Sequence, residues 1–188
     1  MTYHDDITGS DLARIGAGFA VRDSIAWRPV LTVAKYAGTD LSVDPLDVIV
    51  APGNLLTTAG LTRITSLIIA GGGQGATNTA TRLGVGNSST AAAVGQTDLQ
   101  AAAGASNRYF MTMDATYPQV SAGVITFKAT FGTADGNFAW NEWCIDIGTP
   151  TVTAGTTVNA TMLNRAVQSL GTKTSAGTWV ATATITLS

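Results

Sequence analysis

The stretch that decides the fold is GVITFKATFGTADGNFAWNEWCIDIG, residues 123–148. Side chains of a β-strand alternate between its two faces. The first half therefore predicts a half-buried strand with a clear inside. Its expected inner face carries four apolar residues: Ile125, Phe127, Ala129 and Phe131. Its expected outer face carries Val124, Thr126, Lys128 and Thr130. The segment GTADGN at 132–137 predicts a turn into a second strand.

The second strand, within residues 137–148, has large apolar side chains on both faces. Trp140 shares one face with Glu142 and Cys144, and Trp143 lies on the other. We therefore expect this strand to be covered on both sides. The domain core would cover one side, and a helix or a neighbouring subunit would cover the other. Glu142 is the only glutamate in the chain, and Cys144 is the only cysteine.

The single glutamate suggests either catalysis or a structural ion pair. A glycoside hydrolase needs two carboxylates, at most about 9.5 Å apart even in inverting enzymes. Asp146 is four residues further along the strand, which at about 3.3 Å per residue places it roughly 13 Å away. A more distant aspartate could still complete such a pair. However, an unpaired buried charge is very costly, so we expect Glu142 to pair with a cation, and Arg165 and Lys173 are the nearest candidates in sequence.

The rest of the C-terminal region predicts further short, threonine-rich strands separated by glycine-rich turns. The segments RYFMTMDATYP (108–118) and GVITFKATFG (123–132) are expected to form a strand pair joined around PQVSAG. TWVATATITLS (178–188) predicts a closing strand with Trp179 on its apolar face. This spacing indicates a mainly β fold, an antiparallel β-sandwich. The residues expected in its core or ion pair are Phe127, Phe131, Trp140, Glu142, Trp143, Arg165 and Trp179.

One or two short helices are expected within this fold. In NLLTTAGLTRITSLIIAGGG (54–73), Leu61, Ile64 and Ile68 have helical spacing, Asn54 is a candidate N-cap, and the glycines end the helix. GQTDLQAAA (95–103) could form a second, shorter helix. Residues 1–52 show weak periodicity and contain prolines, which favour edge positions in sheets. We therefore expect an extended N-terminal docking arm with short strands over 1–52 and the sandwich over 53–188.

Composition excludes several functions. Charged residues make up 12% of the 188 residues, against about a quarter in typical domains, which suggests a surface largely covered by partners. Lys and Arg are scattered singly, so we expect no nucleic-acid binding. No apolar run approaches the roughly 18 residues that span a membrane. The acidic N-terminal sequence is unlike a signal peptide, so synthesis in a cytoplasm without an export signal is expected.

The remaining motifs predict no catalytic residue, metal site or cofactor. His4 is the only histidine, so a histidine-based triad is not expected, and Cys144 has no neighbouring base in sequence. Gly71-x-Gly73-x-x-Ala76 follows a predicted helix, whereas a dinucleotide fingerprint must precede one. DLSVDPLD (40–47) could supply oxygen ligands to calcium but does not match an EF-hand loop, so a solvated loop is expected.

Several motifs in order resemble tailed-phage virion surface proteins of the head-decoration, short-fibre and tail-collar types. These motifs are NLLTTAGLTRITSLIIAGGG (54–73), TRLGVGNSSTAAAVGQTDLQ (81–100), VITFKATFGTADGNFAWNEWCID (124–146) and MLNRAVQSLGTKTSAGTWVATATITLS (162–188). The resemblance covers roughly residues 53–188. It implies a non-enzymatic, β-rich, homo-oligomeric protein on a virion surface, without catalytic residues.

We therefore expect a decoration or short-fibre protein of a tailed bacteriophage, attached to the head surface. Its expected partners are further copies of itself, in a homotrimer, and the major capsid or tail proteins of the virion. One alternative is a tail-associated receptor-binding protein that uses exposed aromatic side chains to bind host surface glycan. A less favoured alternative is a glycoside hydrolase that uses Glu142.

Overall fold

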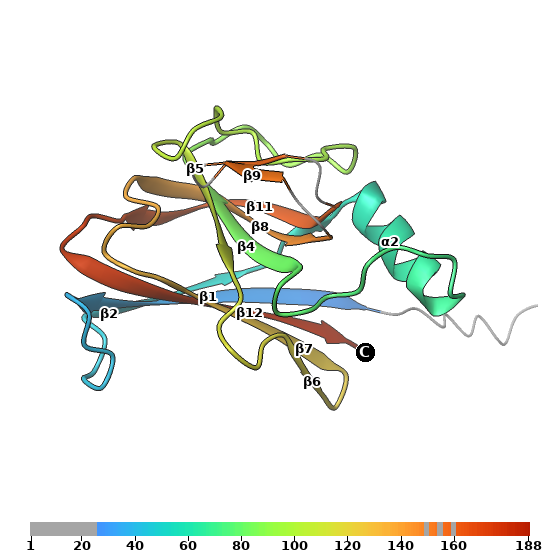
Figure 1. Cartoon of the computed structure of the whole chain (residues 1–188), viewed down its shortest axis with the longest axis horizontal. Helices are drawn as coiled ribbons and strands as arrows, with labels where there is room; N and C mark the ends of the chain where they lie inside the picture. The colour runs from blue at the N-terminus through green and yellow to red at the C-terminus, as the bar shows by residue number, and fades with distance from the viewer. Residues whose placement is uncertain (1–25, 149–150, 154–155, 159–160) are drawn as a thin grey trace, which may run out of the picture.

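The chain folds into two antiparallel β-sheets packed face to face, as the computed structural model shows (Figure 1). The structure describes residues 26–148, 151–153, 156–158 and 161–188. Within these ranges, five strands make up each main sheet, and one short helix packs at the end of the sandwich. The prediction of a mainly β, sandwich-type fold is confirmed.

The first sheet has the strand order β2–β1–β12–β7–β6. Its strands are β1 (Trp27–Ala37), β2 (Asp47–Pro52), β6 (Gln119–Ser121), β7 (Val124–Phe131) and β12 (Gly177–Leu187). The alternation predicted for 124–131 is confirmed: Phe127, Ala129 and Phe131 are buried, while the intervening residues are partly exposed. Strand β12 lies at the centre, paired with β1 on one side and β7 on the other.

The second sheet has the order β3–β11–β8–β4–β5. Its strands are β3 (Leu55–Leu56), β4 (Thr81–Gly86), β5 (Arg108–Thr112), β8 (Ala139–Ile147) and β11 (Thr161–Thr172). A separate two-stranded ribbon pairs β9 (Thr151–Thr153) with β10 (Thr156–Val158). Strand β8 is central and almost wholly buried, which confirms that both of its faces are covered. Trp140 and Trp143 both lie in the main core, so the expectation that Trp140 shares a face with Glu142 is wrong: the register between β8 and β11 shifts between Trp140 and Glu142, which interrupts the alternation.

The main core lies between the two sheets. Trp140 of β8 is its aromatic centre, with ring centroids 4.6 Å from Phe131 and 4.8 Å from Trp179 in edge-to-face geometry, which is favourable for aromatic pairs. The Trp140 indole N–H donates to the Gly136 carbonyl at 2.8 Å, so the buried ring leaves no unpaired donor. This ties the turn before β8 to the core.

Part of the expected N-terminal arm belongs to the sandwich. Residues 27–37 form β1, which pairs along its whole length with β12, and residues 47–52 form β2 beside it. The inner face of β1 buries Leu31 and Val33 completely. Pro29 is tolerated near the start of β1, and Pro52 ends the edge strand β2, as proline's missing N–H requires. Residues 1–25 lie outside the described residues.

The predicted pairing of 108–118 with 124–131 is wrong. Residues 108–112 form β5, which pairs with β4 in the second sheet, whereas the hairpin partner of β7 is β6. The chain crosses between the sheets near Asp114, whose carboxylate accepts from the Thr130 amide at 2.9 Å and its hydroxyl at 2.8 Å. Both segments alternate similarly, so their pattern did not specify which sheet each would join.

Two helix predictions also need correction. The helix is α2 (Thr58–Ile68), and its N-cap is Thr57, whose hydroxyl accepts from the Gly60 amide at 2.9 Å. Asn54 instead accepts a hydrogen bond from the Trp27 indole at 2.8 Å. Residues 95–103 form a loop rather than a second helix, because two of its amides are bonded to a side chain of the sheet.

Candidate functional site

Glu142 and Arg165 meet on the outer face of the second sheet. Arg165 lies on β11, diagonally across from Glu142 on β8. Its Nε donates to Glu142 Oε2 at 2.7 Å, and its Nη2 lies 2.6 Å from the same oxygen. Both side chains are 0% exposed. The structure thus brings together the glutamate and one of the two cations considered for it.

The other polar atoms of this pair bond to the loop that covers them. Glu142 Oε1 accepts from the Ala101 amide at 2.8 Å, and Oε2 from the Gln100 amide at 3.1 Å. Arg165 donates to the Gln96 side chain at 2.9 Å. It also donates to the Thr90 carbonyl at 2.8 Å. A buried ion pair is stable only when its remaining donors and acceptors are satisfied, and here the loop satisfies them.

The structure differs from the expectation that a helix or a neighbouring subunit covers the outer face of β8. The segment 87–107 covers its outer face, rather than the helix or a neighbouring subunit. A second apolar cluster also anchors this segment: Leu99 packs with Phe110, Cys144 and Met162. Helix α2 packs instead on β11. Gly86 of β4 has no side chain because an added Cβ would overlap Glu142 Oε1.

The arrangement does not fit Glu142 as a catalyst. The carboxylate is completely buried and already bonded to one guanidinium and two backbone amides. A catalytic acid or nucleophile must contact its substrate, and no atom of this side chain is open to one. The pair acts as a clamp that holds the loop on the sheet.

Lys173, the other cation considered for Glu142, lies elsewhere. Its Nζ donates to the Gly132 carbonyl at 2.6 Å and to Asn137 at 3.0 Å. The side chain thereby closes the turn between β7 and β8. Burial lowers the pKa of Lys173, and the nearby Asp135 opposes this shift.

The five aromatic residues predicted as structural all lie in the main core: Phe127, Phe131, Trp140, Trp143 and Trp179. Trp179 is also covered by the Lys35 ammonium, 4.7 Å from its ring centroid. Trp27 is half-buried and bonded to Asn54. The three core tryptophans therefore support the sandwich and, at 7% exposure or less, are not open for stacking on sugars.

Cys144 is a buried core residue with 1% exposure. Burial raises the pKa of its thiol well above the usual value, and the negative charges of Asp146, Asp98 and Glu142 add to this shift. A reactive cysteine needs the opposite, an accessible thiol with a lowered pKa. The structure thus gives this side chain a packing role.

Asp146 is buried and has a raised pKa, whereas the sequence suggested for it only a possible pairing with Glu142. It is 4% exposed, and no hydrogen-bond partner among the described residues reaches its Oδ2. Arg82 is its cross-strand neighbour on β4, but their nitrogen and oxygen atoms form no ion pair within 4 Å among the described residues. Burial, and secondarily Asp98, raises the pKa of Asp146 to about 7 despite the opposing charge of Arg82.

Asp146→Asn is expected to stabilise the protein at pH 8 but not below about pH 4. Between an unfolded pKa near 3.8 and a folded pKa of about 7, the folded state binds more protons than the unfolded state. Wild-type stability therefore falls as pH rises through this window. Asparagine removes the titration, so its advantage grows with pH to a few kcal/mol, at most about 4 kcal/mol.

Denaturant unfolding of both proteins at pH 4, 6 and 8 measures this advantage. Asp44→Asn is the matched control, because Asp44 is an exposed aspartate that takes part in no ion pair among the described residues. Parallel pH profiles for wild type and Asp146→Asn would show that Asp146 ionises normally in the folded state.

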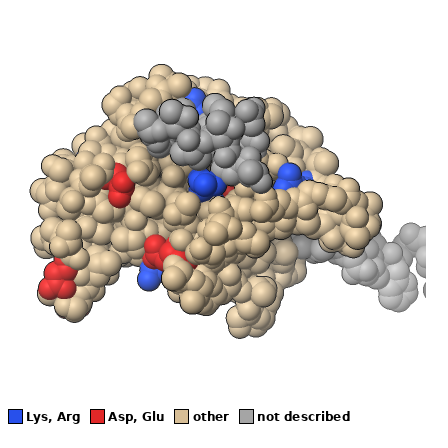
Figure 2. All heavy atoms as spheres, viewed as in Figure 1, with Lys and Arg blue, Asp and Glu red and all other residues tan. Residues whose placement is uncertain are grey.

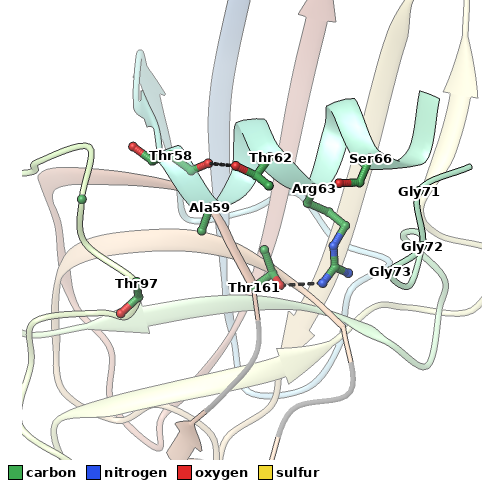
Figure 3. A pocket seen from close by; sticks show the side chains of 11 residues that line it. Thr58, Ala59, Thr62, Arg63, Ser66, Gly71, Gly72, Gly73, Thr97 and Thr161 are labelled. Atoms are coloured by element: carbon green, nitrogen blue, oxygen red, sulfur yellow. Dashed lines mark hydrogen bonds between the residues drawn. The ribbon is translucent and has the colours of Figure 1, made fainter. Parts of the chain in front are cut away.

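A hydroxyl-lined groove runs beside α2 (Figure 3). It has a volume of ≈ 680 Å³. Its hydroxyl side chains are Thr58, Thr62, Ser66, Thr97 and Thr161. Arg63 extends from the helix into it and donates to the Gln74 carbonyl at 2.7 Å and to Thr161 at 2.8 Å. The guanidinium thus already bridges the groove walls.

The glycines beside this groove do not form a phosphate cradle. Gly71–Gly73 follow the C-terminal end of α2, where the helix dipole disfavours anions. Gly72 and Gly73 have φ angles of 91° and 95°, which suit glycine. A Cβ at Gly73 would lie 2.8 Å from Arg63 Nε. These glycines therefore end the helix and make room for Arg63.

Two aspartates of the loop 40–47 bond to residues close to them in the structure. Asp40 accepts from the Ser42 amide at 2.9 Å and its hydroxyl at 2.7 Å, and Asp47 pairs with Lys35 at 2.9 Å. Within the described ranges, no group of three or more His, Cys, Asp or Glu side chains could hold a metal ion. His4 lies outside these ranges.

Among the described residues, no helix combines the length and apolarity needed to cross a membrane. Comparisons of the chain with protein-family models, curated proteins and solved structures find no significant match.

Proposed function

We propose that this chain is a non-enzymatic structural protein of a tailed-phage virion, a homo-oligomeric decoration or short-fibre protein attached to the head surface. The chain would act by binding to copies of itself and to capsid or tail proteins. The order of sequence motifs over residues 53–188 suggests the virion setting. The observation that carries a structural role is the distribution of exposed apolar side chains.

Ten of the exposed large apolar side chains fall into two regions of the sandwich. One region comprises β2 and the connection before it: Leu41, Val43, Leu46, Val48 and Val50, with exposures from 42% to 76%. The other surrounds the end of α2: Leu67, Ile68, Ile69, Val120 and Leu187, with exposures from 37% to 77%. Figure 1 shows α2 and the β1–β2 connection at opposite ends of the molecule. Clustered exposed apolar residues are typical of interaction surfaces.

The surface is also poor in charge. Figure 2 shows a face on which Lys, Arg, Asp and Glu are few and scattered among other residues. Such a surface loses little hydration free energy when a neighbour covers it, and burial of its apolar area at about 25 cal/mol per Å² favours contact. A repeated array of such contacts gains avidity from many copies. These properties suit a subunit of an assembly.

The virion setting is tested by peptide mass spectrometry of purified phage particles whose genome encodes this chain. We expect its peptides in the particles, in a fixed molar ratio to the major capsid protein through successive purification steps. Peptides found only in the soluble lysate, with none retained in purified particles, would overturn the proposal.

The hydroxyl-lined groove beside α2 supports a second candidate function, binding of host glycan by a tail-associated protein. Hydroxyls and a guanidinium can hydrogen-bond to sugar hydroxyls, but no aromatic ring for stacking is among the described residues that line the groove. A glycan array probed with the full chain tests this function. Binding that Thr97→Val abolishes would support the groove as a glycan site, and an array without any binding would end this candidate.

A further inference from the structure

An apolar groove opens where α2 meets the end of the first sheet. Its volume is ≈ 340 Å³. Its lining is apolar except for Arg63, and includes Ile64 and Leu67 of the helix and Ile185 and Leu187 of β12. A shallower hollow beside β6 shares Ala76 and Ile125 with it. The two hollows therefore form one continuous apolar surface.

Two isoleucines protrude beside this groove. Ile68 and Ile69, at the C-terminal end of α2, are each 77% exposed, and Ile68 also lines the groove. Val120 of β6, 76% exposed, lines the adjoining hollow. One surface thus carries both an apolar protrusion, Ile68 and Ile69, and an apolar hollow of suitable chemistry to receive it.

The surface is almost without charge. Among the residues that the structure describes, Arg63 is the only charged one lining the two hollows, and its guanidinium is already bonded to Gln74 and Thr161. A specific small-molecule site would have several polar groups converging on the ligand, and an anionic lipid surface would be met by clustered cations. A neutral apolar surface is best matched by another of the same kind, which meets it without charge repulsion.

We propose that this surface is the contact between copies of the chain, with the Ile68–Ile69 protrusion of one copy in the groove of the next. In a closed symmetric oligomer every copy supplies both halves of such a contact. Specific interfaces bury about 800 Å² per partner, so the contact extends beyond the groove to Val120 and the exposed side of α2. This inference rests on the proposed role as a homo-oligomeric structural protein.

Sedimentation velocity of the full chain over a concentration series tests the contact. Ile68→Asp places a charge in the interface and is expected to weaken self-association at least about tenfold. Ile69→Asp should act in the same direction. Both positions are 77% exposed in the single copy, so the variants should keep the wild-type melting temperature of the dissociated protein. Leu46→Asp is the matched control, because Leu46 is 76% exposed but belongs to the other exposed apolar region, at the β1–β2 connection, which the proposed contact does not include.

A mixing experiment tests how the surfaces fit. Leu187→Asp alters the groove but leaves the protrusion intact, whereas Ile69→Asp alters the protrusion but not the groove, which Ile69 does not line. Each variant alone should be mainly dissociated. An equimolar mixture should regain mixed oligomers, because the intact protrusion of the Leu187→Asp copy can enter the intact groove of the Ile69→Asp copy. Recovery in the mixture supports the protrusion-in-groove contact, and its absence overturns that fit.

The outcomes separate this inference from the proposed function. If wild type self-associates and neither isoleucine variant weakens it, the surface is wrong while the structural role stands. If wild type stays monomeric at every concentration, both are contradicted. If the wild-type chain floats with phosphatidylcholine vesicles and Ile68→Asp abolishes that flotation without changing the oligomer mass, a lipid surface is the occupant and the proposed copy contact is wrong.

Discussion

Glu142→Ala is expected to lower the free energy of unfolding by about 3–5 kcal/mol, because it leaves the buried Arg165 guanidinium without its counterion. It also removes the acceptor for the Gln100 and Ala101 amides. At about 2–4 °C per kcal/mol for a chain of this length, the melting temperature should fall by roughly 6–20 °C. The loop 87–107 should loosen as well, which hydrogen exchange at these two amides would detect.

Asp47→Ala is the control for this measurement. It also removes the carboxylate of an ion pair, but the Asp47 side chain is 56% exposed, so solvent can hydrate the remaining Lys35. The melting temperature should stay close to wild type. A Glu142→Ala protein with an unchanged melting temperature would contradict the buried ion pair. Retained stability together with loss of a hydrolytic activity would instead favour the glycoside hydrolase alternative.

Gly60→Ala is expected to destabilise the protein by about 3 kcal/mol, at the upper end of overpacking effects. Helix propensity alone predicts the opposite, because alanine is favoured over glycine by about 1 kcal/mol in a helix. An added Cβ at Gly60 would overlap the Leu163 carbonyl oxygen and lie 2.8 Å from the Leu163 Cα. Both are backbone atoms of β11, so α2 would have to move away from the sheet.

Gly75→Ala serves as the comparison for the helix variant. Gly75 is partly exposed, and an added Cβ there meets no atom within 4 Å; a substitution near the surface that meets no neighbour usually changes stability by less than about 0.5 kcal/mol. Denaturant unfolding of the two variants and wild type measures the difference. Stabilisation by Gly60→Ala would mean that α2 does not approach β11 as closely as described.

Much of the sandwich could be predicted because its clearest strands are either half-buried or buried on both faces. The alternation around Phe127 marks an inner face directly, and the apolar residues of 137–148 mark a central strand. The free-energy cost of burying an unpaired carboxylate predicted a cation near Glu142, and the structure places Arg165 in contact with it. These inferences needed only local pattern and the high free energy of an unpaired buried charge.

Features that depend on contacts between distant segments could not be read from local pattern. Gly60 lowers helix propensity, and only its approach to Leu163 explains why it is glycine. The segment 95–103 resembles a helix, yet its amides bond to Glu142, about forty residues away. Strand β5 alternates like a partner of β7, but the crossing near Asp114 carries it to the other sheet.

The unusual state of Asp146 could not be predicted for the same reason. Sequence alone places it four residues after Glu142 on one strand, which says nothing of what covers it. Its raised pKa comes from burial and from the negative charge of Asp98, a residue of the loop 87–107. The pKa of Asp146 depends on residues that only the folded chain brings near it, so the sequence could not predict it.

The central claim is that the chain is a self-assembling structural protein. The mass of the purified full-length chain by light scattering, from dilute to concentrated solution, tests it most directly. The account predicts a defined oligomer whose mass is a whole multiple of 19.2 kDa. A monodisperse 19.2 kDa species at every concentration would contradict it.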